Sequence, residues 1–250
     1  MDRLRRLQKM GAMENGLATG RKDFCKNGFD RQGKQEDSEG VLLKKAILYV
    51  HGKGGSSLEA EQYKKNCIGF DVVGVDYNNP LPWVVQKQIK AVYNQLREEY
   101  EHVSLLANSI GCYFAMHTLQ NCAIEKALFI SPILNMEQLI LDMMQGANVT
   151  EDELCHKGEI PTEFGETLSW KYLDFVRQNP IKWDIPTELL YAENDNLTSR
   201  VTVDTFVASH QANLTIMKNG EHWFHTDEQL AFLDGWMKKS LCCISGWQAL

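Results

Sequence analysis

Residues 103–114, VSLLANSIGCYF, constrain the fold more than any other part of the chain. An apolar run ends in Ser109, a small residue lies two positions to either side of it, and helix-like sequence follows at once. This order predicts a strand that turns sharply into a helix, with the serine on the turn. Because the turn is tight, Ala107 and Gly111 must be small, and a strained backbone would hold the hydroxyl at the tip of a sheet. A plain serine at a helix N-terminus would give the same pattern.

A second apolar run, residues 46–50, leads directly into the glycine-rich segment 51–55, HGKGG. Five apolar residues bounded by glycines predict a buried strand, and the glycines let the backbone turn its N–H groups toward a ligand. Such a loop cradles a phosphate or forms an oxyanion hole, in which N–H groups stabilise the negative oxygen of a tetrahedral intermediate. The GxxxxGK[ST] spacing of a phosphate loop is missing. The His-Gly start favours the oxyanion hole over a flexible glycine turn.

The strand predicted at residues 187–192 ends close to two carboxylates. Asp195 is the first candidate for an acid that orients a catalytic histidine, and Glu193 is the second. A carboxylate just beyond a strand end can hold an imidazole in one tautomer and stabilise its protonated form. Asp195 lies between asparagines, so a simple turn former is the other interpretation.

A short strand predicted at 213–217 precedes a loop with two histidines, His222 and His225. Thr226 and Gln229 have capping-box spacing, which predicts that the last helix begins at Thr226. His225 is then tied to the helix start, whereas His222 lies inside the loop, so we favour His222 as the base. The His-x-x-His spacing also fits a metal ion, but the sequence offers no matching set of further ligands.

Serine, then acid, then histidine is the chain order of the α/β-hydrolase triad, and the sequence resembles that family over residues 41–240. The resemblance implies an α/β fold with a mostly parallel sheet of about six strands, crossover helices and a helical cap. It also implies that Ser109 is the nucleophile, Asp195 the acid and His222 the base. Strand-like and helix-like runs alternate along the chain, which independently favours a parallel sheet.

The same resemblance implies an oxyanion hole and shows where this chain departs from the family. The backbone N–H groups of Lys53 and Ile110 are the expected donors, with Gly54 as the alternative to Lys53. Ala107 stands where the family usually has glycine, and Asn108 is an unusual residue before the serine. The family's first two strands are not recognisable, so we expect a sheet that is shortened at one edge.

The chain is expected to form one domain over residues 41–240 with a tail at each end. Residues 133–185 interrupt the alternation and predict two or three helices, which the resemblance implies are a cap over the site. Met and aromatic residues there either line an apolar acyl pocket or only pack the insertion onto the domain. Residues 1–40 are polar and predict a disordered tail, and residues 241–250 predict a loose C-terminal end.

The composition narrows the classes of partner. The formal net charge of −7 leaves no basic footprint for nucleic acid, and no apolar stretch is long enough to span a membrane. The seven cysteines form no Cys-x-x-Cys pair and predict free thiols in a reducing cytoplasm. Cys112 lies close to the predicted turn, where packing is a better interpretation than chemistry.

Together these features predict a serine hydrolase that cleaves a carboxylic ester or thioester through an acyl-enzyme intermediate, with no metal or organic cofactor. The expected partner is a small-molecule acyl substrate, and the sequence does not determine the oligomeric state. A binding or interaction protein with the same fold and an idle triad is the alternative. Lyase or perhydrolase chemistry on the same three residues also stays open.

Overall fold

The structure is a computed structural model that describes residues 44–242. The tail predicted at residues 1–40 lies outside the described residues, as do residues 243–250. The last helix ends at Cys242. It therefore includes the first two residues of the segment 241–250, for which a loose C-terminal end was expected.

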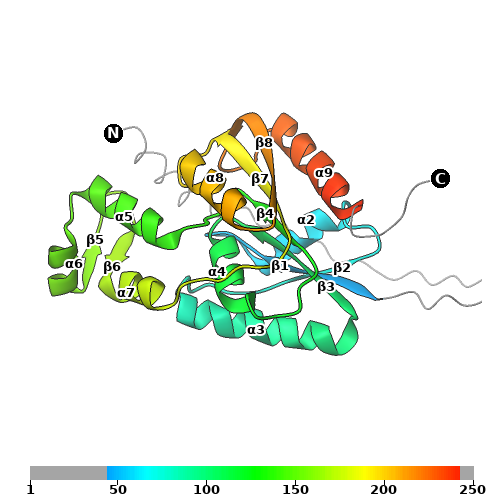
Figure 1. Ribbon diagram of the computed structural model, residues 1–250, viewed down its shortest axis with the longest axis horizontal. Helices are drawn as coiled ribbons and strands as arrows, with labels where there is room; N and C mark the ends of the chain where they lie inside the picture. Colours follow the sequence, from blue (N-terminus) through cyan, green and yellow to red (C-terminus); the bar gives the residue numbers. More distant parts are fainter. Residues whose placement is uncertain (1–43, 243–250) are drawn as a thin grey trace, which may run out of the picture.

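A six-stranded sheet forms the centre of the molecule (Figure 1). Its strands are, in spatial order, β2 (Asp71–Gly74), β1 (Lys45–Val50), β3 (His102–Asn108), β4 (Ala127–Ile130), β7 (Thr187–Asn194) and β8 (Ala212–Glu221). Every neighbouring pair is parallel, which confirms the predicted fold class. Parallel strands end at the same edge of the sheet, so the loops that carry the candidate residues emerge together there.

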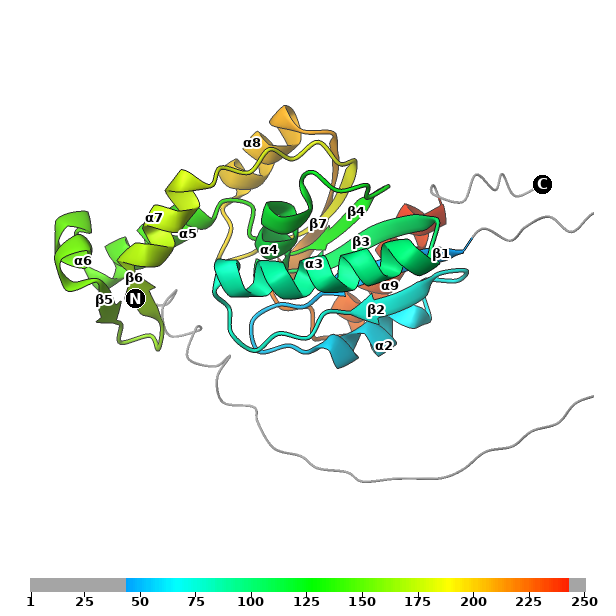
Figure 2. The same ribbon diagram turned by 90° about the horizontal axis from the view of Figure 1, so that it is seen from below.

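Helices cover both faces of the sheet (Figures 1 and 2). They are α2 (Ala60–Lys64), preceded by the 3-10 turn η2 (Ser57–Glu59), α3 (Pro82–Glu99), α4 (Ile110–Leu119), α8 (Arg200–Ser209) and α9 (Asp227–Cys242). Within residues 44–242 no helix is long and apolar enough to cross a membrane.

The alternating side chains of β1 divide the interior into two cores. Ala46, Leu48 and Val50 join the core on the side of α3 and α4. Ile47 and Tyr49 join the core on the side of α2 and α9. A strand that is buried on both faces needs apolar side chains at successive positions, and this explains the unbroken apolar run in the sequence.

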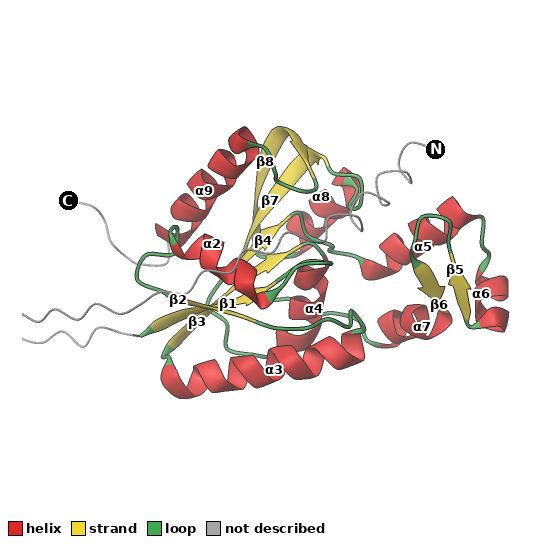
Figure 3. Cartoon of the chain, turned by 180° about the vertical axis from the view of Figure 1, so that it is seen from behind, coloured by secondary structure: helices red, strands yellow, loops and turns green. Residues whose placement is uncertain are grey.

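The segment between β4 and β7 forms a lobe beside the carboxyl edge of the sheet (Figure 3). It contains α5 (Met136–Ala147), α6 (Glu151–Lys157), the antiparallel hairpin of β5 (Glu159–Pro161) and β6 (Thr167–Ser169), and α7 (Trp170–Gln178). The sequence predicted two or three helices here but not the hairpin. Each hairpin strand has three residues, which is too short to show a period of two.

Aromatic side chains join this lobe to the first turn of α3. Trp83 packs edge-on against Tyr172 and Phe175 of α7, with ring centroids 6.2 and 5.4 Å away. The Lys171 ammonium lies 4.6 Å from the centroid of the Trp83 ring. Aromatic pairs of this kind contribute about 0.5 to 1.5 kcal/mol each beyond the area they bury. Aromatic residues of the lobe therefore pack it onto the domain. This packing is one of the two roles that the sequence analysis left open for them, the other being to line an acyl pocket.

Candidate active site

Ser109 lies on the turn between β3 and α4, with φ of 52° and ψ of −124°. A non-glycine residue adopts such a conformation only where its surroundings enforce it. Here the Ser109 N–H donates to the Ile130 carbonyl at 3.0 Å, and the Ser109 carbonyl accepts from the Ile133 N–H at 3.1 Å. The end of β4 and the chain that follows it thus hold both sides of the turn, and the strained backbone presents the hydroxyl at the edge of the sheet.

Gly111 explains why the second small position of the motif must be glycine. A Cβ atom there would lie 2.3 Å from the His51 carbonyl oxygen and 2.5 Å from that of Val50. Both atoms belong to the backbone, so neither can move aside cheaply. Helix α4 therefore lies directly against the end of β1 and its loop. Ala107, on the other side of the serine, is fully buried, and its methyl group is accommodated.

The structure brings the three predicted side chains together. The Ser109 hydroxyl lies 2.9 Å from His222 Nε2, and His222 Nδ1 lies 2.7 Å from Asp195 Oδ2. Ser109 and His222 are 9% and 8% exposed, and the Asp195 side chain is fully buried. They come from the ends of three different strands, β3, β7 and β8, which share one edge of the sheet. In such an arrangement the histidine can take the proton of the serine, while the carboxylate orients the imidazole and stabilises its protonated form.

The second oxygen of Asp195 is held by its own loop. Oδ1 accepts the N–H of Leu197 at 2.8 Å and that of Thr198 at 3.0 Å. The Thr198 hydroxyl in turn donates to the Pro132 carbonyl at 2.8 Å. Asp195 thus forms a turn through one oxygen and bonds His222 through the other, so the turn and the predicted contact with the histidine occur together. Thr198 was missed by the sequence analysis, although an aspartate followed three residues later by threonine is a usable signal.

Glu193, the second candidate acid, serves another purpose. Its carboxylate accepts the N–H of Asn219 at 2.9 Å and so ties the end of β7 to β8. Within the described residues no contact between Glu193 and His222 is found, and the geometry favours Asp195.

His225 is also held away from the serine. Its Nδ1 lies 2.8 Å from the Trp223 carbonyl, and its backbone N–H donates to Gln229 Oε1 at 2.9 Å. The Gln229 N–H donates to the Thr226 hydroxyl at 3.2 Å, which confirms the predicted capping box at the start of α9. The described part of the chain holds no group of three or more His, Cys, Asp or Glu side chains placed to bind a metal ion.

Of the two predicted oxyanion-hole residues, Ile110 follows Ser109 directly, and Lys53 belongs to a loop that approaches Ser109 at Gly52. Lys53 is in a turn closed by a hydrogen bond onto the Gly52 carbonyl, and a Cβ atom on Gly52 would lie 3.3 Å from Ser109 Cβ. The next residue, Gly54, has a φ of 75°, which favours glycine. Ile110 begins α4, where the first N–H groups have no partner inside the helix. The loop and the helix start therefore flank the serine hydroxyl.

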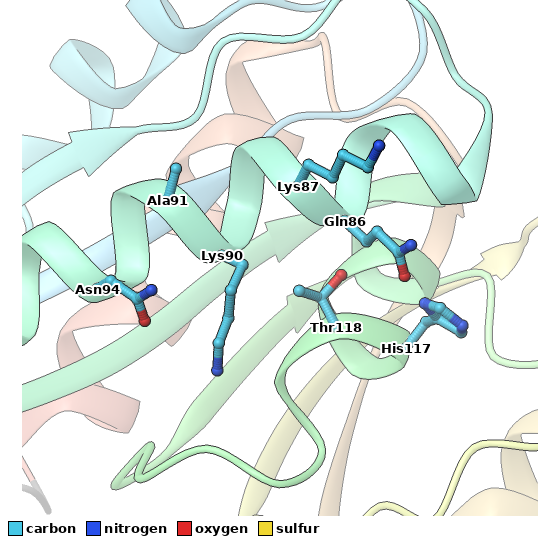
Figure 4. Close-up of a pocket in the computed structure, with 7 residues that line it drawn as sticks. All are labelled: Gln86, Lys87, Lys90, Ala91, Asn94, His117 and Thr118. Carbon is cyan, nitrogen blue, oxygen red and sulfur yellow. The ribbon is translucent and has the colours of Figure 1, made fainter.

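Two cavities differ in their relation to this site. The larger, of about 530 Å³, is an open groove between α3 and α4 and contains none of the candidate site residues (Figure 4). It is lined by Gln86, Lys87, Lys90, Ala91, Asn94, His117 and Thr118. The smaller, of about 300 Å³, is lined in part by His222 and Asn108. The smaller cavity is therefore the one that borders the candidate active site.

Comparison with known proteins places the chain in a family. The sequence model of an uncharacterised protein family, UPF0227, matches residues 46–230, which is more than half of the chain. The chain belongs to this family. The matched region contains Ser109, Asp195 and His222. No curated protein matches the chain.

Solved structures share the fold of this UPF0227 member. Est1E from Butyrivibrio proteoclasticus is 15% identical with a TM-score of 0.66, over 82% of this chain and 89% of that chain. Alpha/beta hydrolase domain-containing protein 10 from mouse is 16% identical with a TM-score of 0.63, over 80% and 90%. A putative hydrolase from Agrobacterium vitis S4 is 13% identical with a TM-score of 0.63, over 79% and 88%. The chain thus has the α/β-hydrolase fold, as its resemblance to that family implied.

In this UPF0227 chain an ion pair links the loop after β1 to the lobe. The Lys53 ammonium pairs with the Glu166 carboxylate in the turn between β5 and β6. Such a half-exposed pair contributes at most about 1 kcal/mol, yet it brings the hairpin close to a predicted oxyanion-hole residue. Sequence analysis missed Glu166 because the two partners are far apart in the chain and share no local pattern.

Cys112, three residues after Ser109, is fully buried. Burial raises the pKa of its thiol well above the usual value, so the reactive thiolate is not populated at neutral pH. This agrees with a packing role for Cys112 and leaves Ser109 as the nucleophile candidate at the turn.

Proposed function

We propose that this chain is a serine hydrolase that cleaves a carboxylic ester or thioester through an acyl-enzyme intermediate. The observation that carries the proposal is the buried hydrogen-bonded series from the Ser109 hydroxyl through His222 to Asp195, with distances of 2.9 and 2.7 Å. A serine hydroxyl is a weak nucleophile unless a base removes its proton as it attacks. His222 is placed to be that base, and Asp195 is placed to hold its tautomer.

The proposed reaction follows from these positions. His222 takes the Ser109 proton as the serine oxygen attacks the acyl carbon. The negative oxygen of the tetrahedral intermediate is stabilised by the backbone N–H groups of Ile110 and Lys53. The His222 imidazolium then gives its proton to the leaving group, which departs and leaves the acyl group on the serine. A water molecule, deprotonated by His222, releases the acyl group as a carboxylic acid, and these steps require no cofactor.

The strained turn supports this assignment. Ser109 keeps a positive φ although an unstrained serine would avoid it, and strained positions of this kind cluster at active sites. A serine that only capped α4 would place its side chain on a backbone N–H of the first turn, but Ser109 makes no such bond. Its hydroxyl faces His222 instead.

The proposed setting is a reducing cytoplasm with a small-molecule acyl substrate. Cys67, Cys112, Cys122 and Cys155 are free thiols among the cysteines whose side chains are described. Free thiols persist where the compartment is reducing.

Turnover of p-nitrophenyl acetate by four variants tests the proposal. Ser109→Ala and His222→Ala should each reduce kcat on the order of 10⁴-fold or more, and the double variant should lose nothing further, because the two residues act as a unit. His225→Ala is the matched control, since the His225 ring contacts the Trp223 carbonyl and the Glu221 carboxylate, and it should cost less than about tenfold. A Ser109→Ala variant that retains a tenth of the wild-type rate would refute the assignment and favour a non-catalytic binding protein.

A further inference from the structure

The smaller cavity lies between α2, α9 and the loop after β8, and His222 forms part of its wall. Ile130, Phe224 and Leu233 supply apolar surface, and Asn108 contributes an amide. His222 therefore borders both Ser109 and the cavity. In an acyl transfer the same imidazole gives its proton to the departing atom, so the leaving group has to lie on the side of His222. The cavity is in the right place to hold it.

One charge in this cavity lacks an ionic partner. Lys65 and Asp234 on the rim pair with each other at 2.7 Å. The Glu59 carboxylate forms no ion pair within residues 44–242, and accepts the hydroxyl of Tyr49 at 2.6 Å. Tyr49 is fully buried, and burial raises the pKa of its phenol, so the hydroxyl stays a donor. Since the paired charges cancel, the cavity carries one negative charge.

The Glu59 carboxylate also lies against the predicted oxyanion loop. A Cβ atom on Gly55 would be only 2.6 Å from its Oε1 atom. A negative charge at this place opposes the negative charge that develops in a tetrahedral intermediate. A cation bound beside Glu59 would offset that repulsion during the reaction.

The lining of the cavity also includes an exposed aromatic ring. Trp223 follows His222 directly, lines the cavity and is 60% exposed. Its ring stacks on that of His225 with centroids 5.2 Å apart, which fixes its orientation. A tryptophan face together with a carboxylate is the combination that attracts an organic ammonium group.

We propose that this cavity binds the leaving group, and that the leaving group is a compact amino alcohol or aminothiol with a protonated amine. This inference rests on the serine hydrolase proposed above. The bond between the acyl carbon and the oxygen or sulfur of the leaving group breaks, and its electron pair stays on that atom. The atom takes the proton that His222 received from Ser109, and the ammonium remains charged throughout. Water then releases the acyl group from the serine as a carboxylic acid.

Two acetate esters of equal shape test the inference. In 2-(dimethylamino)ethyl acetate the leaving group is an ammonium at pH 7, and in 3-methylbutyl acetate a CH replaces the nitrogen. We expect the wild-type chain to show a kcat/KM about tenfold higher for the ammonium ester, the effect of one partly screened charge pair. Glu59→Gln keeps the acceptor for Tyr49 and should bring the ratio close to one. Glu61→Gln, in the adjoining helix α2 and paired with Lys64 at the surface, should leave the wild-type ratio.

A second variant and a second measurement cover the case in which Glu59→Gln fails to fold. Trp223→Leu changes an exposed side chain and should also lower the ratio. In the wild type, 2-(dimethylamino)ethanol should inhibit p-nitrophenyl acetate turnover about tenfold more strongly than 3-methylbutan-1-ol. Equal kcat/KM values for the two esters together with equal inhibition by the two alcohols overturn the inference and leave the hydrolase intact. If the wild-type chain turns over none of these esters and Ser109 does not react, both this inference and the proposed serine hydrolase function are overturned.

Discussion

The contact at Gly111 gives the sharpest stability prediction. Replacing this glycine by alanine puts a Cβ atom 2.3 Å from the His51 carbonyl oxygen and 2.5 Å from that of Val50. The two oxygens lie at and just after the end of β1, a strand paired on both sides, where backbone movement would disturb two strand pairings. The strain therefore has to be relieved by shifting α4 away from the sheet, and the helix would take Ser109 with it.

The expected cost follows from two opposing effects. Overpacking of a well-packed site typically costs about 1 to 3 kcal/mol and occasionally more, and contact with two backbone atoms belongs at the upper end. Alanine in place of a helical glycine regains at most about 1 kcal/mol. We therefore expect Gly111→Ala to lower the free energy of unfolding by about 2 to 3 kcal/mol. For a domain of this size that corresponds to a melting temperature about 5 to 10 °C lower.

Gly235 in α9 provides a matched control. A Cβ atom there meets nothing within 4 Å, so Gly235→Ala gains the helix propensity without a clash. It should raise the melting temperature by about 2 to 4 °C. Calorimetry of the three proteins, with urea titration for the free energies, measures both effects. A Gly111→Ala variant that melts within about 1 °C of the wild type would refute the tight contact between α4 and the loop after β1.

Three further predictions concern the acid, the core and the thiols. Asp195→Asn should keep the fold but reduce kcat by about 10⁴-fold, because the amide favours the wrong tautomer of His222; a loss below tenfold would contradict the role of Asp195. Trp183→Phe should lower the free energy of unfolding by about 1 to 3 kcal/mol, because the buried indole N–H loses its 2.8 Å hydrogen bond to the Thr187 hydroxyl. Urea titration measures this change, and an unchanged unfolding midpoint would contradict the prediction. Iodoacetamide at pH 8 should modify the exposed Cys155 but not Cys112 in the folded chain, because burial raises the Cys112 pKa and so suppresses its thiolate. Peptide mapping identifies the modified cysteines, and a modified Cys112 would contradict its burial.

The sequence predicted those parts of the fold that depend on residues close together in the chain. The run before Ser109 and the glycine two residues after it already indicate a strand, a sharp turn and a helix. Thr226 and Gln229 indicate the start of α9 through a spacing of three residues. The alternation of strand-like and helix-like runs indicates the parallel sheet. In each case the physical cause lies within a few residues of the signal.

The parts that the sequence did not predict depend on contacts between distant segments. Glu59 looks like an ordinary helix residue until the fold places it beside Gly55 and the cavity. The pairing of Lys53 with Glu166 requires the hairpin to be in position first. The preference for His222 over His225 came from a local signal, the capped helix start beside His225, and His222 is the histidine that lies next to Ser109. The hydrogen bond from His222 to Asp195 could be inferred only through the resemblance, because it joins the ends of two strands.

Reaction with a fluorophosphonate probe tests the central claim most directly. The probe forms a covalent adduct with a serine only when a base activates the hydroxyl and an oxyanion hole accepts the phosphoryl oxygen. The account predicts one adduct per chain, mapped by peptide mass spectrometry to Ser109, and none in the folded Ser109→Ala variant. A folded wild-type chain that stays unlabelled, or one labelled at a different serine, would contradict it.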